Sequence, residues 1–175
     1  AHASKKRIQV VLSTSDIHLK HKFNIGRSEA MEITHEMVKY AKSFDCEVEF
    51  AAEDATRTDI NFLIDVFKIA VDAGAIIVEI PDTVGYSTPV EYGKIVSSVC
   101  GALPDDIIVS THCHNDLGLA VANTLAGISA GAKQAEVTVN GIGERAGNAS
   151  LEEVVMNLDT RKDIYQIDTE IETKH

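Results

Sequence analysis

Five short runs of apolar and β-branched residues alternate with five segments of helical apolar spacing, and this alternation limits the fold more than any other feature. Each run is followed by a polar loop and then by the helical segment. The predicted strands are residues 7–12, 47–52, 75–80, 107–109 and 135–139. Strict strand–helix alternation predicts a parallel sheet with right-handed crossovers. The predicted class is therefore α/β.

Several helix ends also carry sequence signals. Ser28 and Thr58 are predicted N-caps, and Gly74 is placed to end the helix that Thr58 would begin. Residues 88–91 (TPVE) and 150–153 (SLEE) match capping boxes. The helix after Ser28 is expected to bury an apolar stripe formed by Ala30, Ile33, Met37, Ala41 and Phe44.

The positions of the polar segments distinguish two architectures, an open doubly wound sheet and part of an eightfold βα barrel. Polar segments lie at or just beyond the C-terminal ends of all five predicted strands, at residues 13–18, 53–58, 81–85, 112–116 and 140–148. A barrel gathers its active site from several strand ends at that face. An open sheet concentrates it at one switch point, often beside a glycine-rich loop after the first strand. The first loop here has no glycine before Gly26, which favours the barrel, with five of its eight βα units.

Composition excludes some partners. The 175 residues are 45% hydrophobic, which suits one globular domain with a substantial core. The net charge of −11 argues against nucleic acid and anionic membrane surfaces as partners. No apolar run reaches transmembrane length, and no secretory signal is visible. The cysteines, Cys46, Cys100 and Cys113, are odd in number and lack a framework spacing, so we expect a reducing, cytoplasmic compartment.

Two histidines at the end of the fourth predicted strand are the leading candidates for chemistry. Side chains at positions i and i+2 of a strand point to the same face, so His112 and His114 should project together, with Cys113 turned away. Two neutral imidazoles side by side form part of a ligand set for a divalent metal. A lone H-x-H also occurs at ordinary strand–loop junctions, so its meaning depends on the rest of the chain.

Five motifs together make the chain similar to a known family. They are STSDIH (13–18), EDATR (53–57), IPDTVG (80–85), HCHNDLG (112–118) and GIGERAGN (141–148). Their order and spacing resemble the acyl-CoA-condensing, metal-dependent TIM barrels. That family includes the 2-isopropylmalate synthases, which the motifs resemble most, the citramalate and homocitrate synthases, and hydroxymethylglutaryl-CoA lyase. The resemblance implies a partial (β/α)8 barrel comprising strands 4–8, with residues 1–158 in the catalytic barrel and residues 159–175 as a connector or tail.

The resemblance also implies a role for six residues. They are His112, His114 and Asn148 as metal ligands, Thr83 and His18 as substrate-binding residues, and Glu53 as a catalytic residue that handles water or a proton. Ordinary alternatives stay open, such as a left-handed turn at Asn148 and a local turn bond at Thr83. One departure is Ala51, where many of these synthases have Ser, and it weakens the assignment of the substrate.

The implied activity is the condensation of acetyl-CoA with 2-oxoisovalerate in leucine biosynthesis, by a homodimeric parent enzyme. The metal is Mg, Mn or Zn, and the sequence does not choose among them. The family's first-strand Asp-Arg-Glu motif, which supplies a metal ligand, is not in this sequence, so we expect the chain alone to be inactive. Citramalate-type condensation with pyruvate and a non-catalytic barrel fragment are the alternatives. A doubly wound nucleotide-binding domain is disfavoured, because the phosphate loop is missing.

Overall fold

The computed structural model describes residues 5–172, which form a parallel sheet in the order β1-β2-β3-β4-β5. The strands are Arg7–Ser13 (β1), Glu47–Glu53 (β2), Ile77–Asp82 (β3), Ile108–Cys113 (β4) and Gln134–Glu136 (β5). Every strand lies beside the next one in the chain, and the order never reverses. A doubly wound sheet reverses its strand order at the switch point. The architecture is therefore α/β, with five consecutive units of a βα barrel, as the sequence predicts.

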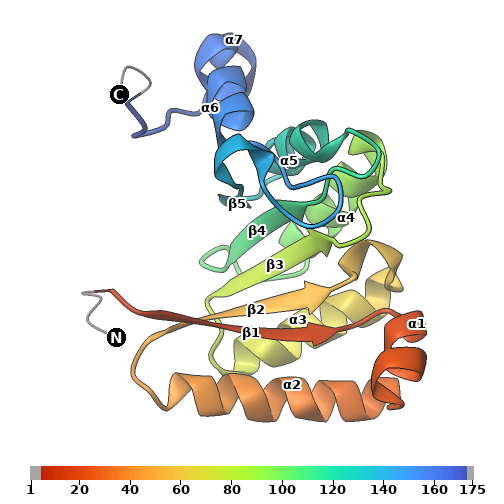
Figure 1. Ribbon diagram of the computed structural model, residues 1–175. Helices are drawn as coiled ribbons and strands as arrows, with labels where there is room; N and C mark the ends of the chain where they lie inside the picture. Colours follow the sequence, from red (N-terminus) through yellow and green to blue (C-terminus); the bar gives the residue numbers. More distant parts are fainter. Residues whose placement is uncertain (1–4, 173–175) are drawn as a thin grey trace.

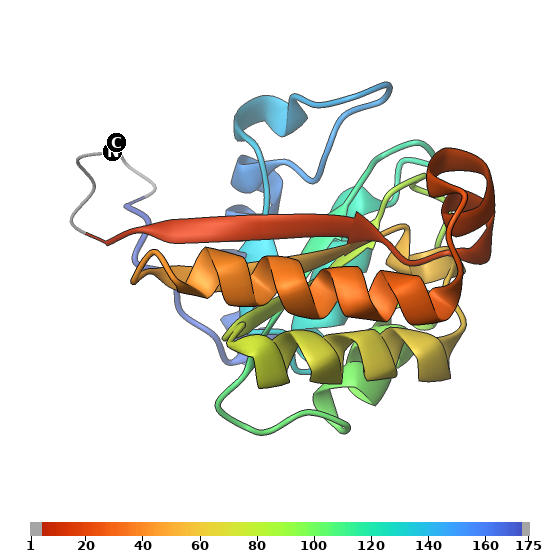
Figure 2. The same ribbon diagram turned by 90° about the horizontal axis from the view of Figure 1, so that it is seen from below.

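One helix follows each strand and covers one face of the sheet. The principal helices are Arg27–Lys42 (α2), Ile60–Ala73 (α3), Pro89–Cys100 (α4), Ala120–Ser129 (α5) and Leu151–Thr160 (α6). Figure 1 shows α2 to α5 as one layer against the sheet, and Figure 2 shows α2 and α3 side by side beneath β1. The first loop carries the short helix α1 (Asp16–His18) and a π-helical turn (Leu19–Phe23), and α7 (Lys162–Tyr165) follows α6.

The two faces of the sheet differ in polarity because side chains alternate along each strand. The face toward the helices is apolar, and Val48, Phe50, Val78 and Ile80 are fully buried there. The opposite face is largely polar. We give the name inner polar layer to seven of its polar residues that form one hydrogen-bonded group: Gln9, Glu49, Glu79, Ser110, His112, Gln134 and Glu136. The apolar face therefore holds the core, and the inner polar layer lies beneath the candidate site.

Three of the predicted helix ends are confirmed. Thr88 begins α4 with a reciprocal capping box to Glu91. Gly74 ends α3 with φ +115°, a conformation that favours glycine. Ser150 caps α6 by accepting the backbone N–H of Glu153.

Two predicted N-caps are wrong. Gly26, not Ser28, precedes α2, and Asp59, not Thr58, caps α3 by accepting the N–H of Phe62. Thr58 was a reasonable candidate by residue type, but its hydroxyl bonds the Asp54 carbonyl instead, at 3.0 Å.

The predicted buried stripe of α2 is half right. Ala30 and Ala41 are buried, but Met37 is 46% exposed and Phe44, beyond the helix end, is 55% exposed. The buried positions between the two alanines are Thr34 and Val38. The buried face therefore runs through Thr34 and Val38, whereas Met37 belongs to an exposed face. The predicted stripe missed Thr34 because threonine is not counted as apolar, although this residue lies against the core.

Some boundaries also shift. Strand β3 begins two residues later than expected and includes Pro81 and Asp82, and β5 ends at Glu136. Helix α6 continues to Thr160, and α7 lies within the predicted connector. The outer ends of the two predicted segments, residues 1–4 and 173–175, lie outside the described residues. Among residues 5–172, no helix combines the length and apolar character needed to cross a membrane.

Candidate functional site

His112 and His114 lie together at the C-terminal end of β4. Their ring centroids are 5.1 Å apart and the ring planes differ by 29°. Cys113, between them, is fully buried on the opposite face, where burial raises the pKa of its thiol to about 12. The alternation of the strand thus places the two imidazoles on one face, as the sequence predicts.

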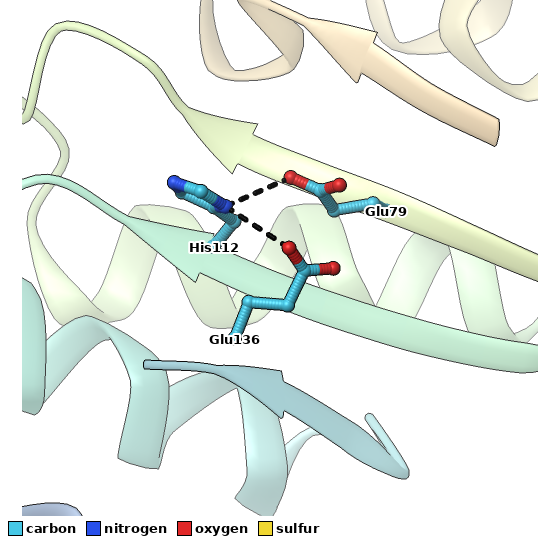
Figure 3. A group of neighbouring side chains, drawn as sticks. All are labelled: Glu79, His112 and Glu136. Atoms are coloured by element: carbon cyan, nitrogen blue, oxygen red, sulfur yellow. Dashed lines mark hydrogen bonds and ion pairs between the residues drawn. The ribbon is translucent and has the colours of Figure 1, made fainter. Parts of the chain in front are cut away.

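His112 contacts two carboxylates through a single ring nitrogen. Its Nδ1 lies 3.1 Å from Glu79 Oε1 and 3.3 Å from Glu136 Oε2. Figure 3 shows the other ring nitrogen, Nε2, turned away from both. Burial opposes protonation of His112, but the hydrogen bonds to Glu136 and Glu79 outweigh it and raise the pKa of the imidazole to about 10. Metal binding at Nε2 therefore requires that nitrogen to release its proton.

Sequence reasoning missed Glu79 and Glu136. Both lie in strands beside β4, and the register pairs His112 with Pro81 of β3 and with Glu136 of β5. A signal was available, because each glutamate stands between apolar residues of a predicted strand, where an unpaired charge is costly. Their common partner was not visible in the sequence.

His114 faces the loop of residues 141–148 (GIGERAGN), which we call the glycine-rich loop. An isolated antiparallel bridge pairs it with Asn148, so the two residues face each other directly across adjoining segments of the backbone. His114 Nδ1 and Asn148 Oδ1 are both buried and have no hydrogen-bond partner among residues 5–172. Burial, followed by the neighbouring charge of His112, lowers the pKa of His114 and keeps it in the neutral form that binds metals.

The loop can approach Asn148 only because of its glycines. A Cβ on Gly143 would lie 2.7 Å from Asn148 Cγ and 3.0 Å from its Oδ1. Gly147 has φ +95°, and a Cβ there would collide with the carbonyl oxygen of Gly141. A side chain at Gly143 would displace Asn148, and one at Gly147 would displace the loop backbone, so the two glycines hold Asn148 against His114.

These donors fit a divalent metal. Nε2 of His112 is free of the two carboxylates. His114 Nδ1 and Asn148 Oδ1 are buried and have no hydrogen-bond partner among the described residues, although Glu144 Oε2 lies 3.9 Å from His114 Nδ1. Imidazole nitrogen and amide oxygen suit Mn or Zn, and oxygen ligands also suit Mg. A second set also exists in the described part of the chain, because ligand atoms of Glu79, His112 and Glu136 all lie within 4.8 Å of one another.

The histidines open onto a cavity of about 290 Å³ at the strand ends. Four of the six predicted site residues line it, namely Glu53, Thr83, His112 and His114. His18 and Asn148 are not among its lining residues in the described chain. His18 contacts Glu53, which lines the cavity, and Asn148 is paired with His114, which also lines it.

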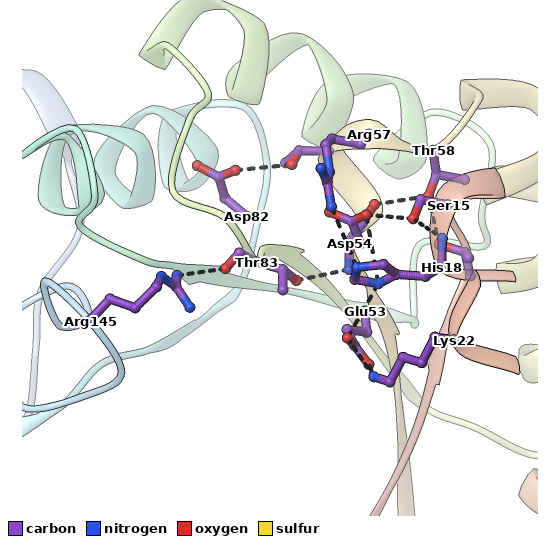
Figure 4. Close-up of polar contacts among 12 residues, drawn as sticks. Ser15, His18, Lys22, Glu53, Asp54, Arg57, Thr58, Asp82, Thr83 and Arg145 are labelled. Carbon is purple, nitrogen blue, oxygen red and sulfur yellow. Dashed lines mark hydrogen bonds and ion pairs between the residues drawn. The ribbon is translucent and has the colours of Figure 1, made fainter. Parts of the chain in front are cut away.

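Glu53 is held by residues of the first loop. Figure 4 shows it between Lys22, whose Nζ lies 2.7 and 2.8 Å from its oxygens, and His18, whose Nδ1 lies 3.4 Å away. Burial raises the pKa of Glu53, but the hydrogen bonds from Lys22 and Ser13 and the charges of Lys22 and His18 together outweigh it, so the net pKa is lowered. The carboxylate therefore stays ionised at neutral pH. Lys22 was not among the predicted site residues.

Thr83 connects two parts of the site. Its Oγ1 accepts the backbone N–H of Asp54 at 2.8 Å, so the hydroxyl hydrogen remains available to a ligand. Its carbonyl oxygen accepts a hydrogen bond from Nη2 of Arg145 at 2.8 Å. The same guanidinium donates two hydrogen bonds, of 2.7 and 2.8 Å, to the carboxylate of Asp116. Arg145, another residue absent from the prediction, thus ties the glycine-rich loop to β3 and to the loop after β4.

The fold and the position of the site define a class of protein, the βα barrels that gather polar side chains at the C-terminal ends of their strands; this chain forms five βα units of such a barrel. The HMGL-like family model matches residues 1–175, and the chain belongs to this divalent-metal-dependent family.

Two curated relatives are 2-isopropylmalate synthases. The chain is 54% identical over 175 residues to 2-isopropylmalate synthase 1 of Caldanaerobacter subterraneus subsp. tengcongensis, covering 99% of this chain and 44% of that protein. It is 50% identical over 175 residues to the enzyme of Pelotomaculum thermopropionicum, covering 99% of this chain and 35% of that protein. The chain thus spans less than half the length of these relatives.

Solved structures agree on the fold. Hydroxymethylglutaryl-CoA lyase from Pseudomonas aeruginosa matches with a TM-score of 0.79 at 19% identity, over 93% of this chain and 58% of that one. An HMG-CoA lyase from Acinetobacter baumannii, solved with coenzyme A and 3-methylmalate, matches with a TM-score of 0.75 at 20% identity, over 88% and 54%.

Proposed function

We propose that this chain forms the metal-binding and 2-oxo-acid-binding part of the catalytic barrel of a 2-isopropylmalate synthase. The reaction is the condensation of acetyl-CoA with 2-oxoisovalerate in leucine biosynthesis. The observation that carries the proposal is the convergence of His112, His114, Thr83 and Glu53 on one cavity. The 2-isopropylmalate synthase relatives support the choice of reaction, and the lyase solved with coenzyme A supports a CoA thioester as one substrate.

His112, His114 and Asn148 would hold the metal, which is Mg, Mn or Zn. When bound, such a cation polarises a ketone and stabilises the alkoxide that forms from it. Burial lowers the pKa of His114, which favours its neutral form. Its Nδ1 and Asn148 Oδ1 have no hydrogen-bond partner among the described residues, so both could bind a metal.

Thr83 is suited to hold the carboxylate of the oxo acid. Because its oxygen already accepts the N–H of Asp54, its hydroxyl hydrogen can donate to an anion in the cavity. Arg145 lines the same cavity and contributes positive charge there, although Asp116 neutralises part of it. These contacts orient an oxo acid so that its ketone carbon is exposed to attack.

Glu53 is suited to handle a proton or water. Condensation requires a base to take a proton from the acetyl methyl group, and the product thioester is then hydrolysed by water. Lys22 keeps Glu53 ionised, and an ionised carboxylate can accept a proton or orient a water molecule. His18 Nδ1 lies 3.4 Å from this carboxylate without hydrogen-bonding it, and a protonated His18 would pair with it.

A chimera tests the proposal. The chain replaces the matching segment of the Caldanaerobacter synthase, and release of free thiol is measured with acetyl-CoA and either 2-oxoisovalerate or pyruvate. We expect activity with 2-oxoisovalerate and a loss of at least about 100-fold in His112→Ala and His114→Ala, because each substitution removes a metal ligand. His35→Ala, on the outer surface of α2, is the matched control and should retain activity.

Three results would contradict the proposal. A preference for pyruvate would favour citramalate-type chemistry. Full activity without His112 and His114 would remove the metal site. A folded chimera that releases no thiol would favour a non-catalytic barrel segment.

The proposal includes a homodimer and a cytoplasmic setting. All three cysteines, each within the described residues, are free thiols, as expected in a reducing compartment. Light scattering on the chimera gives the oligomeric state, and a monomeric active enzyme would contradict the dimer.

A further inference from the structure

The inner polar layer beneath the metal site is unusual for a barrel. Barrel interiors are dominated by Val, Ile and Leu. Here Glu49 and Glu79 are each only 3% exposed within that layer. A buried carboxylate is costly unless it is paired and hydrogen-bonded. Glu49 is paired with Arg7 at 3.2 Å, so Glu79 is the group that requires a further explanation.

We propose that Glu79 and Glu136 are positioning residues that jointly accept the Nδ1–H of His112 and so direct its Nε2 into the cavity as the metal ligand. This inference rests on the proposed function, since it concerns the same metal. The 3.1 and 3.3 Å contacts both involve Nδ1. A hydrogen on Nδ1 leaves the lone pair of the neutral imidazole on Nε2.

The two carboxylates approach from opposite sides. Glu79 comes from β3 and Glu136 from β5, the two strands that flank β4. Figure 3 shows both carboxylates reaching the same ring nitrogen, Nδ1, with Nε2 pointing away from them. Turning the ring over would break both hydrogen bonds and place a carbon where the nitrogen now lies. The pair therefore fixes the orientation of the ring as well as its tautomer.

Both carboxylates are themselves anchored. The second oxygen of Glu79 accepts the side-chain amide of Gln9 on β1. The second oxygen of Glu136 accepts the Ser110 hydroxyl at 3.2 Å and the Gln134 amide at 3.4 Å. Supporting groups of this kind hold metal-binding histidines in place, and losing one weakens metal affinity about 10–100-fold.

The same three side chains could instead bind the metal directly. Their ligand atoms lie within 4.8 Å of one another, and the metal would then occupy Nδ1 of His112. The two arrangements require opposite tautomers, and only the positioning arrangement uses His114. They can therefore be separated experimentally.

The experiment is calorimetric titration of the full 175-residue chain with Zn²⁺ or Mn²⁺. We expect Glu79→Gln and Glu136→Gln each to weaken binding about 10–100-fold. Glu49→Gln is the matched control, because Glu49 is a buried glutamate of the same layer that reaches Glu136 but does not contact His112. Its pKa is raised to about 8, so an amide resembles its protonated form at pH 7, and binding should change less than about threefold. His112→Ala and His114→Ala should abolish measurable binding.

A second measurement does not depend on the variants. In the Zn²⁺-bound chain with ¹⁵N-labelled histidine, nitrogen–proton correlation spectra should show the hydrogen of His112 on Nδ1. A hydrogen on Nε2 would place the metal on Nδ1 and overturn the positioning role. So would unchanged affinity in both glutamate variants, or an equal loss in Glu49→Gln. Unchanged binding in His112→Ala and His114→Ala would instead overturn the proposed metal site itself.

Discussion

Gly143 has no side chain, yet it should control the candidate metal site. Its φ lies outside the left-handed region, so alanine is compatible with the backbone. The added Cβ would lie 2.7 Å from Asn148 Cγ, whereas ordinary contacts begin at 3.4 Å. Asn148 Nδ2 would lie closer still, so the side chain must move by at least about 0.7 Å, the difference between the two values for Cγ. Functional groups need to be held within about 0.5 Å of their working positions.

Two effects of Gly143→Ala follow from that displacement. The hydrogen bond from Asn148 Nδ2 to the Ile142 carbonyl, now 3.1 Å, is lost, at a cost of about 1 kcal/mol in the free energy of unfolding. Metal affinity should fall about tenfold, because Asn148 Oδ1 leaves its position beside His114. Urea denaturation and calorimetric titration measure the two effects separately.

A double-mutant cycle tests the reasoning. Asn148→Ala removes all three atoms that the new Cβ would meet, so Gly143→Ala should cause no further loss of affinity in that background. The expected coupling is about 1.4 kcal/mol, the equivalent of tenfold. An equal loss with and without the Asn148 side chain would refute the steric argument and point to the loop backbone. Gly26→Ala, with no atom within 4 Å of its Cβ, is the control.

Three further predictions concern stability. Burial, followed by the hydrogen bond with Glu136, raises the pKa of Glu49 from 4.5 to about 8. The contribution of Glu49 to the free energy of unfolding is therefore complete below pH 4.5 and is lost as the pH rises through 8. Glu49→Gln should flatten this decline, measured as the urea midpoint from pH 5 to 9. Gly127→Ala should destabilise by about 1–2 kcal/mol in urea denaturation, because its Cβ would lie 2.5 Å from Thr111 Cγ2 and overpacking exceeds the gain in helix propensity. Asp82→Ala should lower the free energy of unfolding by about 3 kcal/mol, because it leaves buried hydroxyl and amide donors without an acceptor. Calorimetry should show this as a fall of about 6–12 °C in Tm. An equally steep loss of stability with pH in Glu49→Gln would contradict the first prediction. An unchanged urea midpoint in Gly127→Ala would contradict the second, and an unchanged Tm in Asp82→Ala the third.

Local pattern was sufficient to predict much of the fold. Strand–helix alternation gave the class, and the position of polar residues after each strand gave the barrel. The period of two along a strand placed His112 and His114 on one face, and this needed no tertiary information. Helix ends were less certain, because Thr58 and Asp59 are both competent caps and only the path of the chain decides between them.

The surroundings of the histidines were decided by the tertiary structure alone. Glu136 reaches His112 across 24 residues because the register of β4 against β5 sets them opposite one another. Lys22 reaches Glu53 across 31 residues because the first loop folds over the end of β2. Register depends on how all the helices pack against the sheet, so no local spacing encodes these pairs. The sequence by itself determined which residues could carry the chemistry, and only the packed sheet decided which carboxylates hold them in place.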